Sequence, residues 1–98
     1  MSKVTLVAKL KAKPEHIDSV KAGLQALVAP TRQEKGCIKY DLHQDQKDPA
    51  IFIFIEEWES AEHLQNHSKA AHVKAFGIAA KGKLESRDLH SLDKVEVA

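Results

Sequence analysis

The sequence predicts an α+β domain of the ferredoxin-like type, with the element order βαββαβ and a four-stranded antiparallel sheet. Two observations carry this prediction. Several short segments repeat apolar residues with the period of two that is typical of strands, and two longer segments repeat them at the spacing of amphipathic helices. At 98 residues the chain is long enough for one modest domain and too short for two. We therefore expect a single domain over residues 1–98.

The first strand and helix are expected within residues 3–36. Every second side chain of residues 3–12 is apolar, as in a half-buried strand: Val4, Leu6, Ala8 and Leu10. Pro14 suits the first position of a helix, whose apolar face is formed by Ile17, Val20, Leu24, Leu27 and Val28. Pro30 should kink or end this helix, and Gly36 is its natural C-terminal stop.

Two adjacent antiparallel strands are expected next. Residues 37–43 place Ile38, Tyr40 and Leu42 on one face, and the single Cys37 is expected to be a small core residue. The polar residues 44–49 then form a hairpin connection to a strand over residues 51–58.

The strand over residues 51–58 is apolar on both faces. One face carries Phe52, Phe54 and Trp58, and the other carries Ile51, Ile53 and Ile55. In a ferredoxin-like sheet the helices of one chain cover only one face, so the second apolar face requires another partner. The pattern therefore predicts a homodimer.

A second helical stretch is expected over residues 60–81, followed by a last strand. Ser60 is a good N-cap and Gly82 marks the stop. The last strand is expected within residues 86–97, on the apolar residues Leu89, Leu92, Val95 and Val97.

Composition excludes several classes of partner. With 15 basic and 14 acidic residues spread along the chain, nothing suggests a nucleic-acid-binding surface. No segment approaches the roughly 20 apolar residues that span a bilayer, so we expect no membrane partner. Residues 3–7 have the pattern of a strand rather than of a signal peptide, so we expect a cytoplasmic protein.

His72 and His67 are the first candidates for catalysis, because histidine exchanges protons most readily near neutral pH. The alternative is that they lie on the surface of the helix. Because they are five residues apart, one continuous helix would point them in different directions. Both can reach one pocket only if the helix breaks near residues 69–71.

Glu56 is the third catalytic candidate. It shares a face with Phe54 and Trp58, so its carboxylate would be desolvated unless it is paired. It could orient a histidine, or it could form a buried ion pair with Arg32 or Arg87.

Four aromatic residues are candidates for binding a flat substrate: Trp58, Tyr40, Phe54 and Phe76. Each could equally serve as core packing, although the Tyr40 hydroxyl would also offer a hydrogen bond. A metal site is not expected. His63 and His67 are four residues apart on one helical face, but no Cys and no HExxH-type glutamate completes the set.

Three short motifs resemble the antibiotic biosynthesis monooxygenase superfamily, and within it the small quinol monooxygenase-like proteins. They are Arg32-x-Glu34-x-Gly36-Cys37-x-x-Tyr40, then Glu56-x-Trp58-x-Ser60, then His67 and His72 followed by Lys74-Ala75-Phe76. The resemblance implies a dimeric α/β barrel of ferredoxin-like subunits. It also implies oxidation of a small electron-rich aromatic, of quinol or anthrone type, by molecular oxygen without flavin, haem or metal. We therefore expect no cofactor.

Other branches of the superfamily give alternative functions. A haem-degrading branch uses an asparagine in the first strand and a haem-ligating histidine ten residues after the tryptophan. Here residues 3–12 lack Asn and that later position is Ser68, so haem degradation is disfavoured. An isomerase branch acts on a small phosphorylated signalling ketone, for which Lys69, Lys74 and Arg87 are possible phosphate ligands. The second alternative, from another functional class, is a non-catalytic dimeric domain that binds a small molecule.

Overall fold

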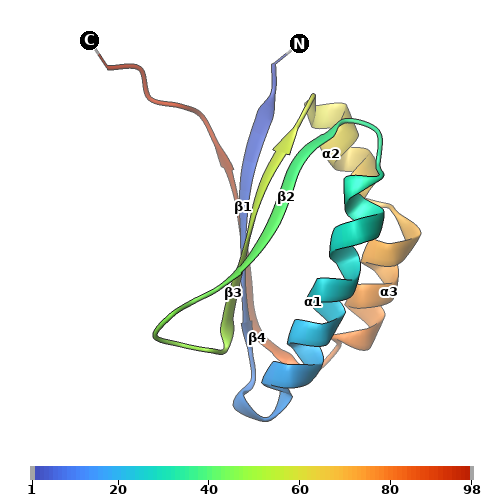
Figure 1. Cartoon of the computed structure of the whole chain (residues 1–98), viewed down its shortest axis with the longest axis vertical. Helices are drawn as coiled ribbons and strands as arrows, with labels where there is room; N and C mark the ends of the chain where they lie inside the picture. The colour runs from blue at the N-terminus through green and yellow to red at the C-terminus, as the bar shows by residue number, and fades with distance from the viewer. Residues whose placement is uncertain (1, 98) are drawn as a thin grey trace.

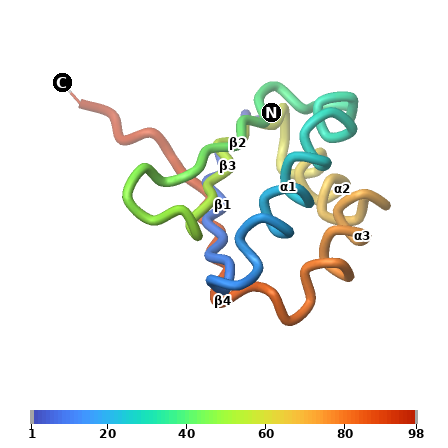
Figure 2. Tube along the Cα trace, turned by 60° about the horizontal axis from the view of Figure 1, so that its bottom comes forward, coloured from blue at the N-terminus to red at the C-terminus, as the bar shows by residue number. Residues whose placement is uncertain are grey.

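The computed structural model describes residues 2–97 and has the predicted ferredoxin-like order. Its elements are β1 (Val4–Ala12), η1 (Pro14–His16), α1 (Ile17–Arg32), β2 (Cys37–Gln44), β3 (Ile51–Trp58), α2 (Ala61–Ser68), α3 (Ala71–Ala79) and β4 (Leu84–Leu92). The strands form one antiparallel sheet in the spatial order β2-β3-β1-β4, which confirms the predicted sheet. All three helices lie on one side of it (Figures 1 and 2).

The core lies between the sheet and the helices. α1 turns one apolar stripe toward the sheet, formed by Val20, Leu24 and Leu27 at helical spacing. β3 contributes Phe52, Phe54 and Trp58, each of which is almost fully buried. Burial of such a side chain contributes roughly 1.5–3 kcal/mol, so these residues hold α1 against the sheet.

The opposite face of the sheet has no helix over it within residues 2–97. Its apolar side chains are only half-buried, and they cross the two central strands: Val7, Ile51, Ile53 and Ile55. Phe52 and Ile53 therefore lie on different faces, as the alternation predicts. We call this surface the open face.

One side chain of β2 departs from the predicted alternation. The pairing of β2 with β3 shifts between Cys37 and Lys39, where a β-bulge adds one residue to β2. The bulge turns Ile38 outward, and Ile38 is 50% exposed rather than beside Tyr40 on the core face. Cys37 packs against the core but is only half-buried.

The structure decides two points about the helices that the sequence left open. Pro30 does not end the first helix: α1 continues two residues further, to Arg32. The second helical stretch is not continuous but is divided into α2 and α3 at residues 69–70. None of the helices in the described part of the chain is long and apolar enough to span a membrane.

The last strand lies earlier than predicted. β4 begins at Leu84 and ends at Leu92, because its pairing with β1 ends where Thr5 meets Leu92. Residues 93–97 continue without regular structure and lead away from the sheet (Figure 1). Val95 and Val97 are accordingly exposed.

Candidate active site

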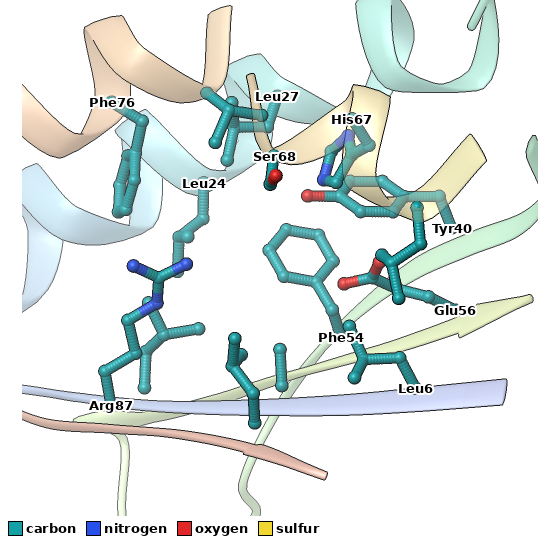
Figure 3. A pocket seen from close by; sticks show the side chains of 15 residues that line it. Leu6, Leu24, Leu27, Tyr40, Phe54, Glu56, His67, Ser68, Phe76 and Arg87 are labelled. Atoms are coloured by element: carbon teal, nitrogen blue, oxygen red, sulfur yellow. The ribbon is translucent and has the colours of Figure 1, made fainter. Parts of the chain in front are cut away.

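An apolar cavity lies between the sheet and the helices (Figure 3). Its empty space of about 570 Å³ includes the open mouth, so the enclosed part of the cavity is smaller. Aliphatic and aromatic side chains form most of the wall: Leu6, Ala8, Leu10, Leu24, Leu27, Phe54, Leu64, Val73, Phe76 and Leu89. The polar lining residues are Tyr40, Glu56, His67, Ser68 and Arg87. The cavity suits a largely apolar ligand with a few polar groups.

Five of the residues that the sequence nominates for the site line this cavity: Tyr40, Phe54, Glu56, His67 and Phe76. Two others do not. Trp58 has no exposed surface and packs against the His67 ring, with 4.8 Å between ring centroids. His72 lies in the first turn of α3 and is turned toward Glu34. These two residues adjoin the lining and are not part of it.

The break between α2 and α3 brings both histidines to one carboxylate. His67 Nδ1 lies 2.8 Å from Glu34 Oε2, and His72 Nε2 lies 2.7 Å from the same oxygen. In one continuous helix these two rings, five residues apart, would point in different directions. The break at residues 69–70 is the one that the sequence requires if both rings are to come together. We call Glu34, His67 and His72 the His–His–Glu cluster.

Hydrogen bonding in this cluster determines which nitrogen of His67 is available to a ligand. A carboxylate oxygen only accepts hydrogen bonds, so Nδ1 of His67 must be the donor. In the neutral ring Nε2 then has a free lone pair. Figure 3 shows the imidazole at one end of the cavity, beside the Tyr40 hydroxyl. Nε2 of His67 is thus available as a proton acceptor at the cavity, while the hydrogen bond from Nδ1 to Glu34 fixes the orientation of the ring.

Gly36 positions the turn that carries Glu34. Its φ of +86° lies in the left-handed region that favours glycine, and a Cβ there would overlap the ring of His63. Its carbonyl accepts a hydrogen bond of 2.8 Å from the backbone N–H of Glu59, just after β3. The turn is therefore held against the connection between β3 and α2, the helix that carries His67.

Glu56 is buried in the cavity wall and is not ion-paired. Its Oε1 accepts a hydrogen bond of 2.9 Å from the indole Nε1–H of Trp58. Burial raises the pKa of Glu56 above its ordinary value of 4.5, while the Trp58 hydrogen bond and His67 partly oppose the increase. Neither predicted arginine pairs with it: Arg32 binds Asp41, and the salt bridges of residues 2–97 do not include Arg87.

Tyr40 stands between the aromatic wall and the His–His–Glu cluster. Its ring stacks on Phe54 at 4.3 Å and meets the His67 ring edge-on at 5.4 Å, both measured between centroids. Burial, with the charge of Glu56 as a second cause, strongly raises the pKa of the phenol. Tyr40 therefore stays protonated near neutral pH and can donate a hydrogen bond to an oxygen of the ligand.

Within residues 2–97, the His–His–Glu cluster is also a set of donor atoms that could hold a metal ion. Its three donor atoms lie within 4.8 Å of one another, and two imidazoles with a carboxylate are common ligands of transition metals. The pair considered from the sequence, His63 with His67, is not this set, since His63 Nδ1 lies 2.7 Å from Ser60 Oγ. Hydrogen bonds alone account for the observed distances.

Glu34 is the main site residue that sequence reasoning missed. It appears in the first family-like motif, but its position in a turn gives no periodic signal. The relevant clue was its place two residues before Gly36, at a helix end. Arg87 was considered only as an ion-pair or phosphate partner, whereas its guanidinium lines the cavity opposite Tyr40 (Figure 3).

Relatives of known structure share this architecture. The crystal structure of PA3566 from Pseudomonas aeruginosa matches with a TM-score of 0.92 and 34% identity, covering 98% of this chain and 97% of that one. A crystal structure of an antibiotic biosynthesis monooxygenase matches with a TM-score of 0.89 and 35% identity, over 95% of this chain and 99% of that one.

Sequence comparison points to the same group. The chain is 27% identical to the probable quinol monooxygenase YgiN of Escherichia coli K12, covering 91% of this chain and 95% of that protein. YcnE of Bacillus subtilis is 32% identical over 82% of each chain. The family model for antibiotic biosynthesis monooxygenase matches residues 3–77, which is most of the sequence. The chain therefore belongs to the antibiotic biosynthesis monooxygenase family.

Proposed function

We propose that this protein is a cofactor-independent monooxygenase that oxidises a small electron-rich aromatic, of quinol or anthrone type, with molecular oxygen. The observation that carries the proposal is the His67 imidazole, which lines an apolar cavity while Glu34 holds its Nδ1–H. A base of this kind is what such a substrate needs, because its anion reduces oxygen far more readily than its neutral form does. The relation to YgiN, a probable quinol monooxygenase, supports the same substrate class.

The reaction begins with proton transfer to His67 Nε2 from a phenolic O–H or a benzylic C–H of the substrate. For an anthrone, oxygen adds to the resulting carbanion, and the peroxide then loses water to leave a carbonyl. One oxygen atom enters the product, and the other leaves as water with both hydrogens of the CH₂ group. Tyr40 donates a hydrogen bond to a substrate oxygen, and the apolar wall excludes water.

His67 rather than His72 is the proposed base. His72 was the first choice from the sequence, but its Nε2 is directed at Glu34 and the residue does not line the cavity. We assign His72 the role of a second donor that holds Glu34 in place. Glu56 lies on the same side of the cavity as Tyr40 and His67 (Figure 3), where its carboxyl group is a further polar contact for the substrate.

The two alternative functions have less support. A phosphorylated ketone would need several cations around its phosphate, but Lys69 and Lys74 are absent from the cavity lining and only Arg87 is present. A non-catalytic binding domain would not need a base whose tautomer is held by a carboxylate. Measured turnover of a substrate would distinguish the proposed enzyme from a non-catalytic binding domain.

We also propose that the protein is a homodimer joined through the open face. Ile51, Ile53 and Ile55 would bury the apolar surface that one chain leaves half-exposed. Such an interface is isologous, so the same side chains meet their counterparts across a two-fold axis.

The test is oxygen uptake with a panel of hydroquinones and anthrone, corrected for autoxidation without protein. Replacing His67 with Gln should lower turnover by about a hundredfold or more, since it removes the base. His16→Gln is the matched control, because His16 lies at the far end of α1. If His67→Gln oxidised the panel as fast as the parent, histidine base catalysis would be wrong.

A further inference from the structure

Arg87 places a cation at the end of the cavity opposite the proposed base. It belongs to β4 and pairs in register with Leu10 of β1, which directs its side chain to the helix-covered face. Figure 3 shows its guanidinium near Leu24 and Phe76, across the cavity from His67. The phenyl ring of Phe54 lies between the two ends.

The Arg87 guanidinium has no carboxylate partner among residues 2–97. The other arginine of the chain behaves differently, since Arg32 Nη2 lies 3.0 Å from Asp41 Oδ1 and its Nε donates to the Tyr40 carbonyl. The one carboxylate in the described cavity wall is Glu56, which is already bound by Trp58. Arg87 is therefore a solvent-exposed guanidinium at the edge of the cavity that makes no salt bridge with Glu56 or with any other carboxylate of residues 2–97, although its charge acts on Glu56.

We propose that Arg87 binds a carboxylate substituent of the aromatic substrate. This inference rests on the proposed function for the reaction itself, and it adds the class of substrate: an aromatic acid whose oxidisable ring position lies away from the carboxylate. A planar guanidinium donates two parallel hydrogen bonds to a carboxylate, which fixes orientation as well as affinity. The apolar wall between Arg87 and His67 then holds the ring so that its reactive end meets the base.

A single cation favours a carboxylate over a phosphate ester. A phosphate dianion carries more charge and more acceptor oxygens than one guanidinium can satisfy. Beyond Arg87, the polar lining side chains are neutral Ser68 and Tyr40, together with Glu56 and His67. Glu56 would repel a dianion whenever it is ionised.

The test is anaerobic isothermal titration calorimetry with 2,5-dihydroxybenzoate and its uncharged amide, 2,5-dihydroxybenzamide. Without oxygen neither ligand is consumed, so binding is measured apart from catalysis. The parent protein should bind the acid roughly tenfold or more tighter than the amide, as expected for a charge-assisted, bidentate contact. Arg87→Gln should abolish this preference. Arg87→Lys should retain only part of it, because the lysine ammonium keeps the charge but lacks the two parallel N–H donors of the planar guanidinium.

Lys74→Gln is the matched control, since it removes the same charge from an exposed site outside the lining. The preference should survive in that variant. Equal binding of acid and amide by the parent, or an acid preference that persists in Arg87→Gln, would overturn the inference. Tighter binding of phenyl phosphate than of the acid would overturn the assignment to a carboxylate. An Arg87-dependent preference without oxygen uptake would refute the proposed function alone.

Discussion

Replacing Glu34 with Gln tests how far the proposed base depends on the carboxylate behind it. The parent Oε2 accepts hydrogen bonds from two imidazoles, at 2.8 and 2.7 Å. The glutamine side chain keeps one acceptor oxygen and gains an amide N–H₂, which cannot accept from a histidine N–H. Both bonds reach the one Oε2, and the neutral amide oxygen that replaces it accepts them without charge assistance. If the amide turns its N–H₂ toward the imidazoles instead, the tautomer of His67 is no longer imposed.

The size of the effect follows from the burial of this cluster. The side chains of Glu34 and His67 are 17% and 10% exposed, so solvent screens their interaction only partly. Hydrogen bonds to charged groups contribute roughly 1.5–3 kcal/mol, which corresponds to a loss in kcat of about 10- to 100-fold. KM should change little, because Glu34 does not line the cavity.

Steady-state oxygen uptake gives both constants, and thermal unfolding reports the loss of stability separately. Glu59→Gln is the matched control, because its side chain is exposed and lies outside the cluster. An unchanged kcat in folded Glu34→Gln protein would refute the positioning role. So would a variant in which only KM rises.

Four further predictions concern other parts of the molecule. Because the pKa of Glu56 is raised in the folded state, the contribution of Glu56 to stability is complete below about pH 4.5 and falls as the pH rises through the folded pKa. Glu56→Gln should remove this fall in thermal melts recorded from pH 4 to 8. Melting temperatures of parent and variant that change with pH in parallel would contradict this prediction. Gly36→Ala should destabilise the fold by about 1–2 kcal/mol or more, since the positive φ and the His63 ring exclude a side chain; Gly77→Ala, where nothing lies within 4 Å of the added Cβ, should not destabilise it in the same denaturant titration. Sedimentation should give about twice the mass of one chain, and Ile53→Lys on the open face should yield a folded monomer, whereas a monomeric parent would exclude the dimer. Elemental analysis of the purified protein should find no stoichiometric metal, and one ion per chain lost on mutation of the His–His–Glu cluster would reverse that expectation.

The fold could be predicted because its strands and first helix have strong periodic patterns. The alternation of residues 51–58 separates Phe52 from Ile53 in the structure as it does in the sequence. The buried stripe of α1 follows the same logic. The periodic pattern gave the wrong side-chain direction, or the wrong end of a strand, where the local backbone pairing departed from regular geometry. The bulge at Ile38 inverts one side chain. The last strand ends at Leu92, opposite the start of its antiparallel partner β1, which no local pattern in residues 86–97 reveals.

The candidate site was only partly accessible from the sequence. His67 and Tyr40 were nominated from their chemistry and their place in family-like motifs, and both line the cavity. Glu34 was not nominated, because its partners are 33 and 38 residues away and only the folded chain brings them together. The sequence predicts Trp58 in the cavity wall. In the structure Glu56 lines the cavity and Trp58 lies behind it, an arrangement that the sequence pattern alone does not reveal.

The most direct test of the proposed function is the oxidation of anthrone under ¹⁸O₂, followed by mass spectrometry of the anthraquinone. A monooxygenase that uses His67 as its base should place one ¹⁸O atom in each product molecule and release the other as water. The His67→Gln variant should form this product no faster than the protein-free control. Anthraquinone without ¹⁸O, or labelled product formed equally fast by His67→Gln, would contradict the account.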